Sequence, residues 1–238
     1  MSYRKDSLVD GEYYHIYNRG NSKQNIFLDE ADYKHFMECL FVCNTRKNFS
    51  FRDDIISPDI DAFDFERGEM LVSIGAWVLM PNHFHIYLTI NPNRSHKSDK
   101  WKKNNISEFM RKLLTAYSKY FNTKYNRTGG LFEGSFKSVI MSQDVQAKYI
   151  FAYIHLNPVK IIDHNWRTKG IDKKKALSFL STYKWGSYFD YSSNEGRKEG
   201  AILNKNDFPK YFLIIKDFNK EIFEWLSFPS YVGHMEKP

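Results

Sequence analysis

Two histidines separated by a single residue are the first feature of this sequence that could carry chemistry. His83 and His85 lie in the stretch WVLMPNHFHIYLTI (77–90), where a Pro-Asn turn separates two apolar runs. In a β-strand the side chains alternate between faces, so both imidazoles would share one face while Phe84 points to the other. Two imidazoles on one rigid strand can bind the same divalent ion. The pattern is equally typical of two partly buried histidines in an amphipathic strand.

A tyrosine and an asparagine one helical turn apart form the second such feature. The apolar periodicity of QDVQAKYIFAYIHLNPVK predicts a helix across 143–157. Asn157 follows Tyr153 by four residues and therefore lies on nearly the same face, and the proline after it places Asn157 at the helix end. A tyrosine oxygen can act as a covalent nucleophile, and a metal lowers the cost of charge on the phosphate it attacks. Core packing of Tyr153 and helix capping by Asn157 are the alternative interpretation.

The elements that must position these residues follow from hydrophobic periodicity and capping signals. Strands are expected at about 12–18, 70–79, 83–90 and 131–141, and helices after Asp29, at about 106–125 and at 143–157. This order predicts an α+β fold: a ferredoxin-like antiparallel sheet (βαββαβ) with helices on one face and the tyrosine-bearing helix appended. In that topology the first strand neighbours the histidine strand, so His15 is a candidate neighbour of the site, and a purely structural histidine is the favoured alternative.

Composition narrows the class of partner. Lys and Arg exceed Asp and Glu by 35 to 28, and 20 Phe, 16 Tyr and 5 Trp are present. Basic side chains replace counterions on phosphates and aromatic rings stack on unpaired bases, so the balance suits nucleic acid, as it also suits an ordinary basic protein. Cys39 and Cys43 are expected to be core residues in a reducing compartment. With no signal peptide and no apolar stretch of spanning length, a cytoplasmic protein without membrane contact is expected.

Five motifs in a fixed order resemble those of the REP-associated tyrosine transposases, within the single-tyrosine, His-hydrophobic-His (HUH) transposase family. They are YHIYNRG (14–20), MPNHFH (80–85), Gly-Gly-Leu-Phe (129–132), YIHLNPVK (153–160) and YKWGSY (183–188). The resemblance covers roughly residues 3–190. It implies a transposase domain across 1–190. Beyond it, the polar run SSNEGRKEG and the apolar pattern from Phe208 to Leu226 predict a linker and a helical tail (191–238) that packs on the core.

The resemblance also implies an activity and a set of site residues. His83 and His85 match the pair that binds a divalent cation, Mg²⁺ or Mn²⁺, in this family, and Asn157 matches a third metal contact. Tyr153 matches the nucleophile, which attacks a phosphodiester of single-stranded DNA to give a 5′-phosphotyrosine and a free 3′-hydroxyl. The implied function is therefore a metal-dependent single-stranded DNA transposase that acts on hairpin or stem-loop DNA.

Expected DNA contacts are Asn18 and Arg19 after the first strand, Lys137 on the fourth strand and Lys160 beyond the tyrosine helix. Relatives often carry a basic residue after the Leu-Phe of the fourth strand, but this chain has Glu133 there, so that phosphate contact is not carried over. The oligomeric state, monomer or homodimer, is left open.

Two other function classes compete with the transposase. One is a nucleic-acid-binding protein of the same fold without catalysis, which the presence of all four site residues disfavours. The other is a metal hydrolase that uses water. Only two histidines, no nearby Asp/Glu motif and a matched tyrosine disfavour it.

Overall fold

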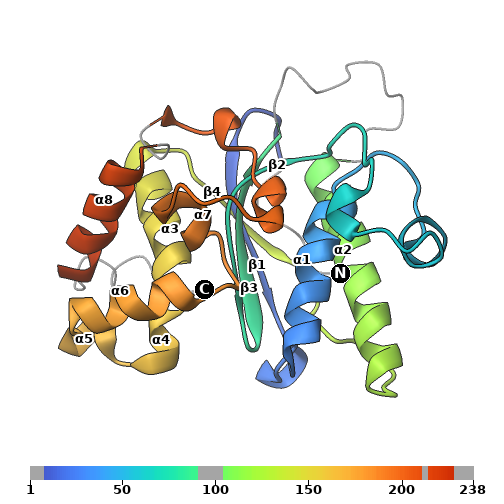
Figure 1. Ribbon diagram of the computed structural model, residues 1–238, viewed down its shortest axis with the longest axis horizontal. Coiled ribbons are helices and arrows are strands. Elements are labelled where there is room, and N and C mark those ends of the chain that lie inside the picture. Colours follow the sequence, from blue (N-terminus) through green and yellow to red (C-terminus); the bar gives the residue numbers. More distant parts are fainter. Residues whose placement is uncertain (1–7, 91–103, 211–213, 228–238) are drawn as a thin grey trace.

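A computed structural model describes residues 8–90, 104–210 and 214–227 of the chain. The chain folds into a four-stranded antiparallel sheet with helices on both faces (Figure 1). Its strands are β1 (Tyr13–Arg19), β2 (Ser73–Met80), β3 (His83–Thr89) and β4 (Lys137–Ile140). Its α-helices are α1 (Glu30–Val42), α2 (Asn105–Lys124), α3 (Asp144–Leu156), α4 (Val159–Ile162), α5 (Trp166–Lys169), α6 (Lys173–Thr182), α7 (Tyr188–Ser192) and α8 (Ile215–Ser227). Short helical turns lie at Asn21–Lys23, Arg52–Ile56, Ala62–Asp64, Lys198–Ile202 and Lys205–Asp207.

The strands are ordered β2-β3-β1-β4, and every neighbouring pair is antiparallel. The expected α+β fold is confirmed. The strand expected at 131–141 is shorter, because Gly134 turns the chain with a φ of +67° and leaves only an isolated bridge between Phe132 and Gly20 before β4 begins. Across the sheet, Tyr17 of β1 lies opposite His85 of β3 and Lys137 of β4. Three strands thus contribute one side chain each to a single row.

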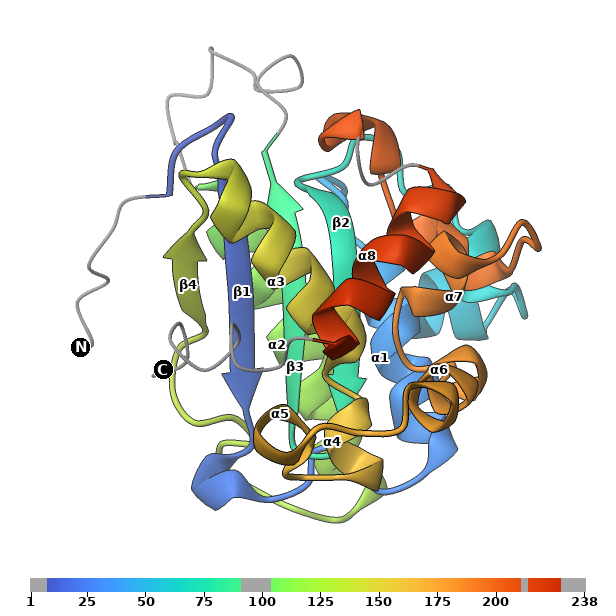
Figure 2. The same ribbon diagram turned by 90° about the vertical axis from the view of Figure 1, so that its left-hand side faces the viewer.

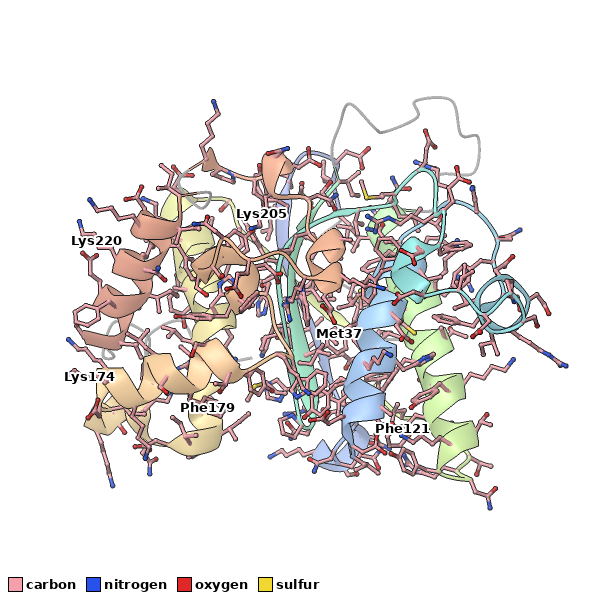
Figure 3. The ribbon with its side chains drawn as sticks, in the orientation of Figure 1. Met37, Phe121, Lys174, Phe179, Lys205 and Lys220 are labelled. Atoms are coloured by element: carbon pink, nitrogen blue, oxygen red, sulfur yellow. The ribbon has the colours of Figure 1, made fainter. Side chains whose placement is uncertain are left out.

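The two faces of the sheet are covered by different helices. Helices α1 and α2 pack on one face, whereas α3 and α8 lie over the other (Figures 1 and 2). On the α1/α2 side, Figure 3 labels Met37 and Phe121, which are buried core residues of those helices. On the outer side, the side chains of Lys174 and Lys220 project from α6 and α8. Helices were expected on one face only, and the appended helix α3 accounts for the second layer.

Helix α1 begins where its capping signal lies. The Asp29 carboxylate accepts a hydrogen bond from the Asp32 backbone N–H, and the Asp32 side chain accepts one from the backbone N–H of Asp29, which forms a capping box. Lys124 at the end of α2 donates to both carboxylates. Cys39 and Cys43 are both free and fully buried in α1 and its C-terminal cap, as core residues would be.

The core continues past residue 190. Tyr191, Ile202 and Phe208 are buried, and the backbone N–H of Asn204 donates to the carbonyl of Ile74 on β2. The Phe208 ring fills the space above Gly75, where a Cβ would collide with it. The chain that follows the polar run at 192–200 therefore packs against β2, the edge strand of the sheet. A membrane-crossing helix is absent from the part of the chain that the structure describes.

Candidate active site on the α3 face of the sheet

The turn that precedes β3 is tied to the end of β1. The backbone N–H of Gly20 donates to the carbonyl of Asn82 at 2.8 Å. A Cβ at Gly20 would collide with the carbonyl oxygen of Gln24, so the close packing of residue 20 against Gln24 requires a glycine. His83, the first residue of β3, is consequently held in a fixed place beside β1.

Both histidines of β3 have their Nδ1 atoms engaged. Nδ1 of His83 lies 2.6 Å from Oδ1 of Asn82, and Nδ1 of His85 lies 2.8 Å from Nε2 of His15 on β1. The rings of His83 and His85 lie edge to face with centroids 5.0 Å apart. Nε2 of His85 is buried and forms no hydrogen bond with any residue that the structure describes. The two Nε2 atoms are therefore the candidates for a metal.

All three imidazoles of this site are shifted toward the neutral form. Burial lowers the pKa of His83 to about 4 and the pKa of His15 to about 3. The pKa of His85 lies well below its ordinary value, first because of burial and then because of the nearby charges, which include those of Lys160 and Arg167. A neutral imidazole is the form that binds a metal.

Helix α3 supplies the other half of the site. It packs against β3 and β2 on the side of the sheet opposite α1 and α2 (Figure 2). The half-buried ring of Tyr153 meets the ring of His85 edge to face at 5.2 Å. Asn157, the C-terminal cap of α3, is fully buried, and its side chain favours the protonated form of His83, against the effect of burial. The structure thus brings together His83, His85, Tyr153 and Asn157.

These donors fit a divalent cation. No cluster of three or more His, Cys, Asp or Glu side chains suited to a metal is found in the described part of the chain. The donors that could hold a cation here are the imidazoles of His83 and His85 and the Asn157 carboxamide. Neither amide atom of Asn157 makes a hydrogen bond of normal geometry with another described residue. Buried polar atoms are rarely left unsatisfied, and a cation between His85 Nε2 and the Asn157 oxygen would satisfy both.

Of the expected DNA contacts, two lysines lie at this site. Nζ of Lys160 is 5.4 Å from the centre of the Tyr153 ring, and Nζ of Lys137 is 5.9 Å from that of Tyr17, which neighbours His85. Both lysines therefore add positive charge close to the rings of Tyr153 and Tyr17.

The other two expected contacts are engaged within the protein. Asn18 is buried, donates to the carbonyl of Gly134 at 3.3 Å and accepts from the Arg19 N–H at 2.9 Å. This favours a structural role for Asn18 over the expected DNA contact. Arg19 forms a bidentate ion pair with Glu133, and both side chains are more than two-fifths exposed. The acidic residue that departs from the family pattern therefore pairs with the basic residue expected to bind DNA.

Two residues of the site were not expected. Tyr17 stacks on His15 at 5.0 Å, and period-two alternation could have identified it, since it lies two residues beyond His15 on the same strand. Arg167 on α5 places its Cζ atom 4.7 Å from the centre of the Tyr153 ring. No local signal marks Arg167, because α5 is reached only after the chain turns back from α3.

Comparison with known proteins identifies one family. Residues 31–157, more than half of the chain, match the family described as "Transposase IS200 like". No match was found among curated proteins.

Several solved structures resemble the chain, among them the following three. A REP-associated tyrosine transposase bound to a REP hairpin is 15% identical, with 80% of this chain and 85% of that chain covered and a TM-score of 0.44. A transposase candidate from Deinococcus radiodurans r1 is 16% identical (62% and 92% covered, TM-score 0.32). A bacterial tRNA(His) guanylyltransferase-like protein in complex with ATP is 12% identical (88% and 80% covered, TM-score 0.39).

Proposed function

This chain belongs to the IS200-like transposase family, and from that premise we propose that it is a metal-dependent transposase of single-stranded DNA. It cleaves and rejoins hairpin-containing DNA through a 5′-phosphotyrosine intermediate. Within the family, the five ordered motifs favour the REP-associated tyrosine transposases. The strand order β2-β3-β1-β4 and the βαββαβ succession of elements support a ferredoxin-like core.

The observation that carries the proposal is the contact between Tyr153 and His85. Their rings meet at 5.2 Å although they come from α3 and β3, elements far apart in the chain. A nucleophile and a metal-binding imidazole must both reach one phosphate, and this contact permits it. Asn157 lies one turn beyond Tyr153, so the same helix brings a third donor to the ion.

Each residue has a role in the proposed reaction. His83, His85 and Asn157 hold a divalent cation, which when bound withdraws charge from the scissile phosphate. Tyr153 Oη attacks phosphorus, the bond from phosphorus to the 3′-oxygen breaks, and the proton lost by the phenol is balanced by one gained by the 3′-hydroxyl. Reversal by a 3′-hydroxyl rejoins the strand without a further energy source, because the phosphodiester is exchanged and never hydrolysed. Lys137 and Lys160 attract the DNA backbone.

A covalent-adduct assay tests the proposal. Single-stranded hairpin DNA is incubated with the protein and Mg²⁺ or Mn²⁺, and a protein–DNA adduct is sought on a denaturing gel. We expect an adduct with the unaltered protein and with Tyr149→Phe, and none with Tyr153→Phe. Tyr149 is a matched control because its buried ring stacks on Tyr153 at 6.0 Å one turn earlier on α3. An adduct in Tyr153→Phe would refute the nucleophile. Binding of the hairpin DNA without its cleavage would indicate the nucleic-acid-binding protein without catalysis. Cleavage of the DNA without any adduct would indicate a metal hydrolase.

A further inference from the structure

A guanidinium withheld from solvent lies against the ring of Tyr153. The Cζ atom of Arg167 is 4.7 Å from the ring centre, and its Nε, Nη1 and Nη2 atoms are all buried. Its charge also contributes to the lowered pKa of His85. Arg167 therefore lies beside the proposed nucleophile, and its charge acts on a proposed metal ligand, although it belongs to none of the five motifs.

The backbone around Arg167 is held by its neighbours. Trp166, the first residue of α5, is fully buried. The turn before it is closed by a hydrogen bond from the Asn165 N–H to the Asp163 carboxylate at 2.8 Å, and α5 ends at Gly170 with a φ of +74°. Because a buried tryptophan anchors one side of Arg167 and a glycine turn ends the helix on the other, the Arg167 side chain is held on the Tyr153 side.

The chemistry of this group suits one kind of partner. A guanidinium presents planar N–H donors whose spacing matches two oxygens of a phosphate. Kept from water, such a cation interacts with an anion more strongly than it would in solvent. The anion that must approach Tyr153 in the proposed reaction is the scissile phosphate, which gains negative charge on its non-bridging oxygens as Tyr153 attacks.

We propose that Arg167 is a further catalytic residue, which donates hydrogen bonds to a non-bridging oxygen of the scissile phosphate. This inference rests on the proposed function. A divalent cation held by His83, His85 and Asn157 would withdraw charge from the same phosphate, and Arg167 would donate to one of its non-bridging oxygens. The Tyr153–phosphorus bond forms and the bond from phosphorus to the 3′-oxygen breaks, while Arg167 keeps its proton and charge throughout. Its contribution is greatest in the transition state, when the oxygen it contacts is most negative.

The test measures single-turnover adduct formation by Arg167→Gln and Arg167→Lys. Each variant acts on the unmodified hairpin and on two hairpins in which a methylphosphonate replaces one or the other non-bridging oxygen. Removal of one donor to a developing oxyanion costs about 10²–10³-fold in rate, so we expect this deficit for Arg167→Gln on the phosphate. Arg167→Lys, which keeps the charge, should recover part of the rate. Lys169→Ala removes a positive charge from an exposed position of the same helix and should react like the unaltered protein.

The methylphosphonates separate a catalytic contact from a packing role. On the hairpin that lacks the oxygen facing Arg167, the unaltered protein and Arg167→Gln should react at rates within about threefold of each other. On the other methylphosphonate the full deficit should persist. A deficit of equal size on all three hairpins, or no deficit on the phosphate, would overturn the inference. Failure of the unaltered protein to form any adduct would instead count against the proposed function itself.

Discussion

His15 Nε2 lies 2.8 Å from His85 Nδ1, so the first strand of the sheet controls the ring that faces the proposed metal site. His85 Nε2 can bind a cation only when Nδ1 carries the proton, and that proton then points at His15. A cation on His85 Nε2 would therefore make His85 the donor and His15 the acceptor of this hydrogen bond, which holds the plane of the His85 ring.

Replacement of His15 is expected to weaken metal binding. Loss of an outer partner of a metal-binding histidine costs about 10–100-fold in affinity, and we expect this loss for Mn²⁺ in His15→Ala. His15→Gln should lose less Mn²⁺ affinity than His15→Ala, since the side-chain carbonyl oxygen of the glutamine can accept the same hydrogen bond. The measurement is calorimetric titration with Mn²⁺ in the absence of DNA, and His164→Gln, at an exposed position, is the control. Unchanged Mn²⁺ affinity in His15→Ala would show that His15 only packs against His85.

Asn157→Leu is expected to raise the free energy of unfolding and to weaken metal binding. The Asn157 amide is buried without a hydrogen bond of normal geometry among the described residues, and such a group costs about 1–3 kcal/mol. In EDTA the variant should therefore unfold at a higher urea concentration than the unaltered protein, and it should bind Mn²⁺ more weakly.

Asn44→Leu provides the matched control for that result. Asn44 is equally buried, but it donates to the carbonyl of Val72 and accepts from the N–H groups of Leu71 and Val72. Its replacement leaves those backbone groups unsatisfied and should lower the free energy of unfolding. Equal destabilisation by both substitutions would refute a metal-binding role for Asn157.

The Arg19–Glu133 ion pair predicts a gain of DNA affinity on removal of the acid. Glu133→Gln removes the carboxylate that pairs with Arg19, so the Arg19 guanidinium can bind a DNA phosphate. The affinity for hairpin DNA should therefore rise and depend more steeply on salt concentration. Arg19→Ala should lower the slope of log affinity against log salt by about one unit. Fluorescence anisotropy across a salt series measures both. A slope that neither variant changes would remove Arg19 from the DNA-binding surface.

His155 predicts part of the pH dependence of stability. It is fully buried on α3 beside Phe151, whose carbonyl lies 2.7 Å from Nδ1, and Nε2 lies 2.9 Å from Ser187 Oγ. Burial lowers the pKa of His155 to about 3, against about 6.5 in an unfolded chain. The unfolded state therefore takes up the proton first, and the free energy of unfolding decreases as the pH falls below about 6.5.

Urea unfolding at pH 7 and pH 5 measures this effect. Between pH 7 and pH 5 one such histidine lowers the free energy of unfolding by about 2 kcal/mol. The decrease over this pH range should therefore be smaller in His155→Gln than in the unaltered protein by about 2 kcal/mol. The absolute stability of the variant at pH 7 does not enter the comparison. Parallel losses in the variant and the unaltered protein would assign the acid sensitivity to other groups.

The local units of this fold could be predicted from the amino-acid sequence alone. Alternation in HFH placed His83 and His85 on one face of a strand, and the spacing of Tyr153 and Asn157 placed both at one side of a helix end. The Asp29 signal marked the start of α1, and the ordered motifs identified the family. The strand, the helix end and the helix start each depend on residues within one or two turns or one strand, where backbone geometry fixes the relative positions of side chains.

The contacts between these units could be seen only in the folded structure. The approach of Tyr153 to His85, the hydrogen bond from His85 to His15 and the ion pair of Arg19 with Glu133 each join residues far apart in the chain. Arg167 reached the site because a buried Trp166 and the turn before α5 returned the chain to the Tyr153 ring. Such contacts depend on how whole faces of the sheet and helices pack, and no local period or spacing encodes them.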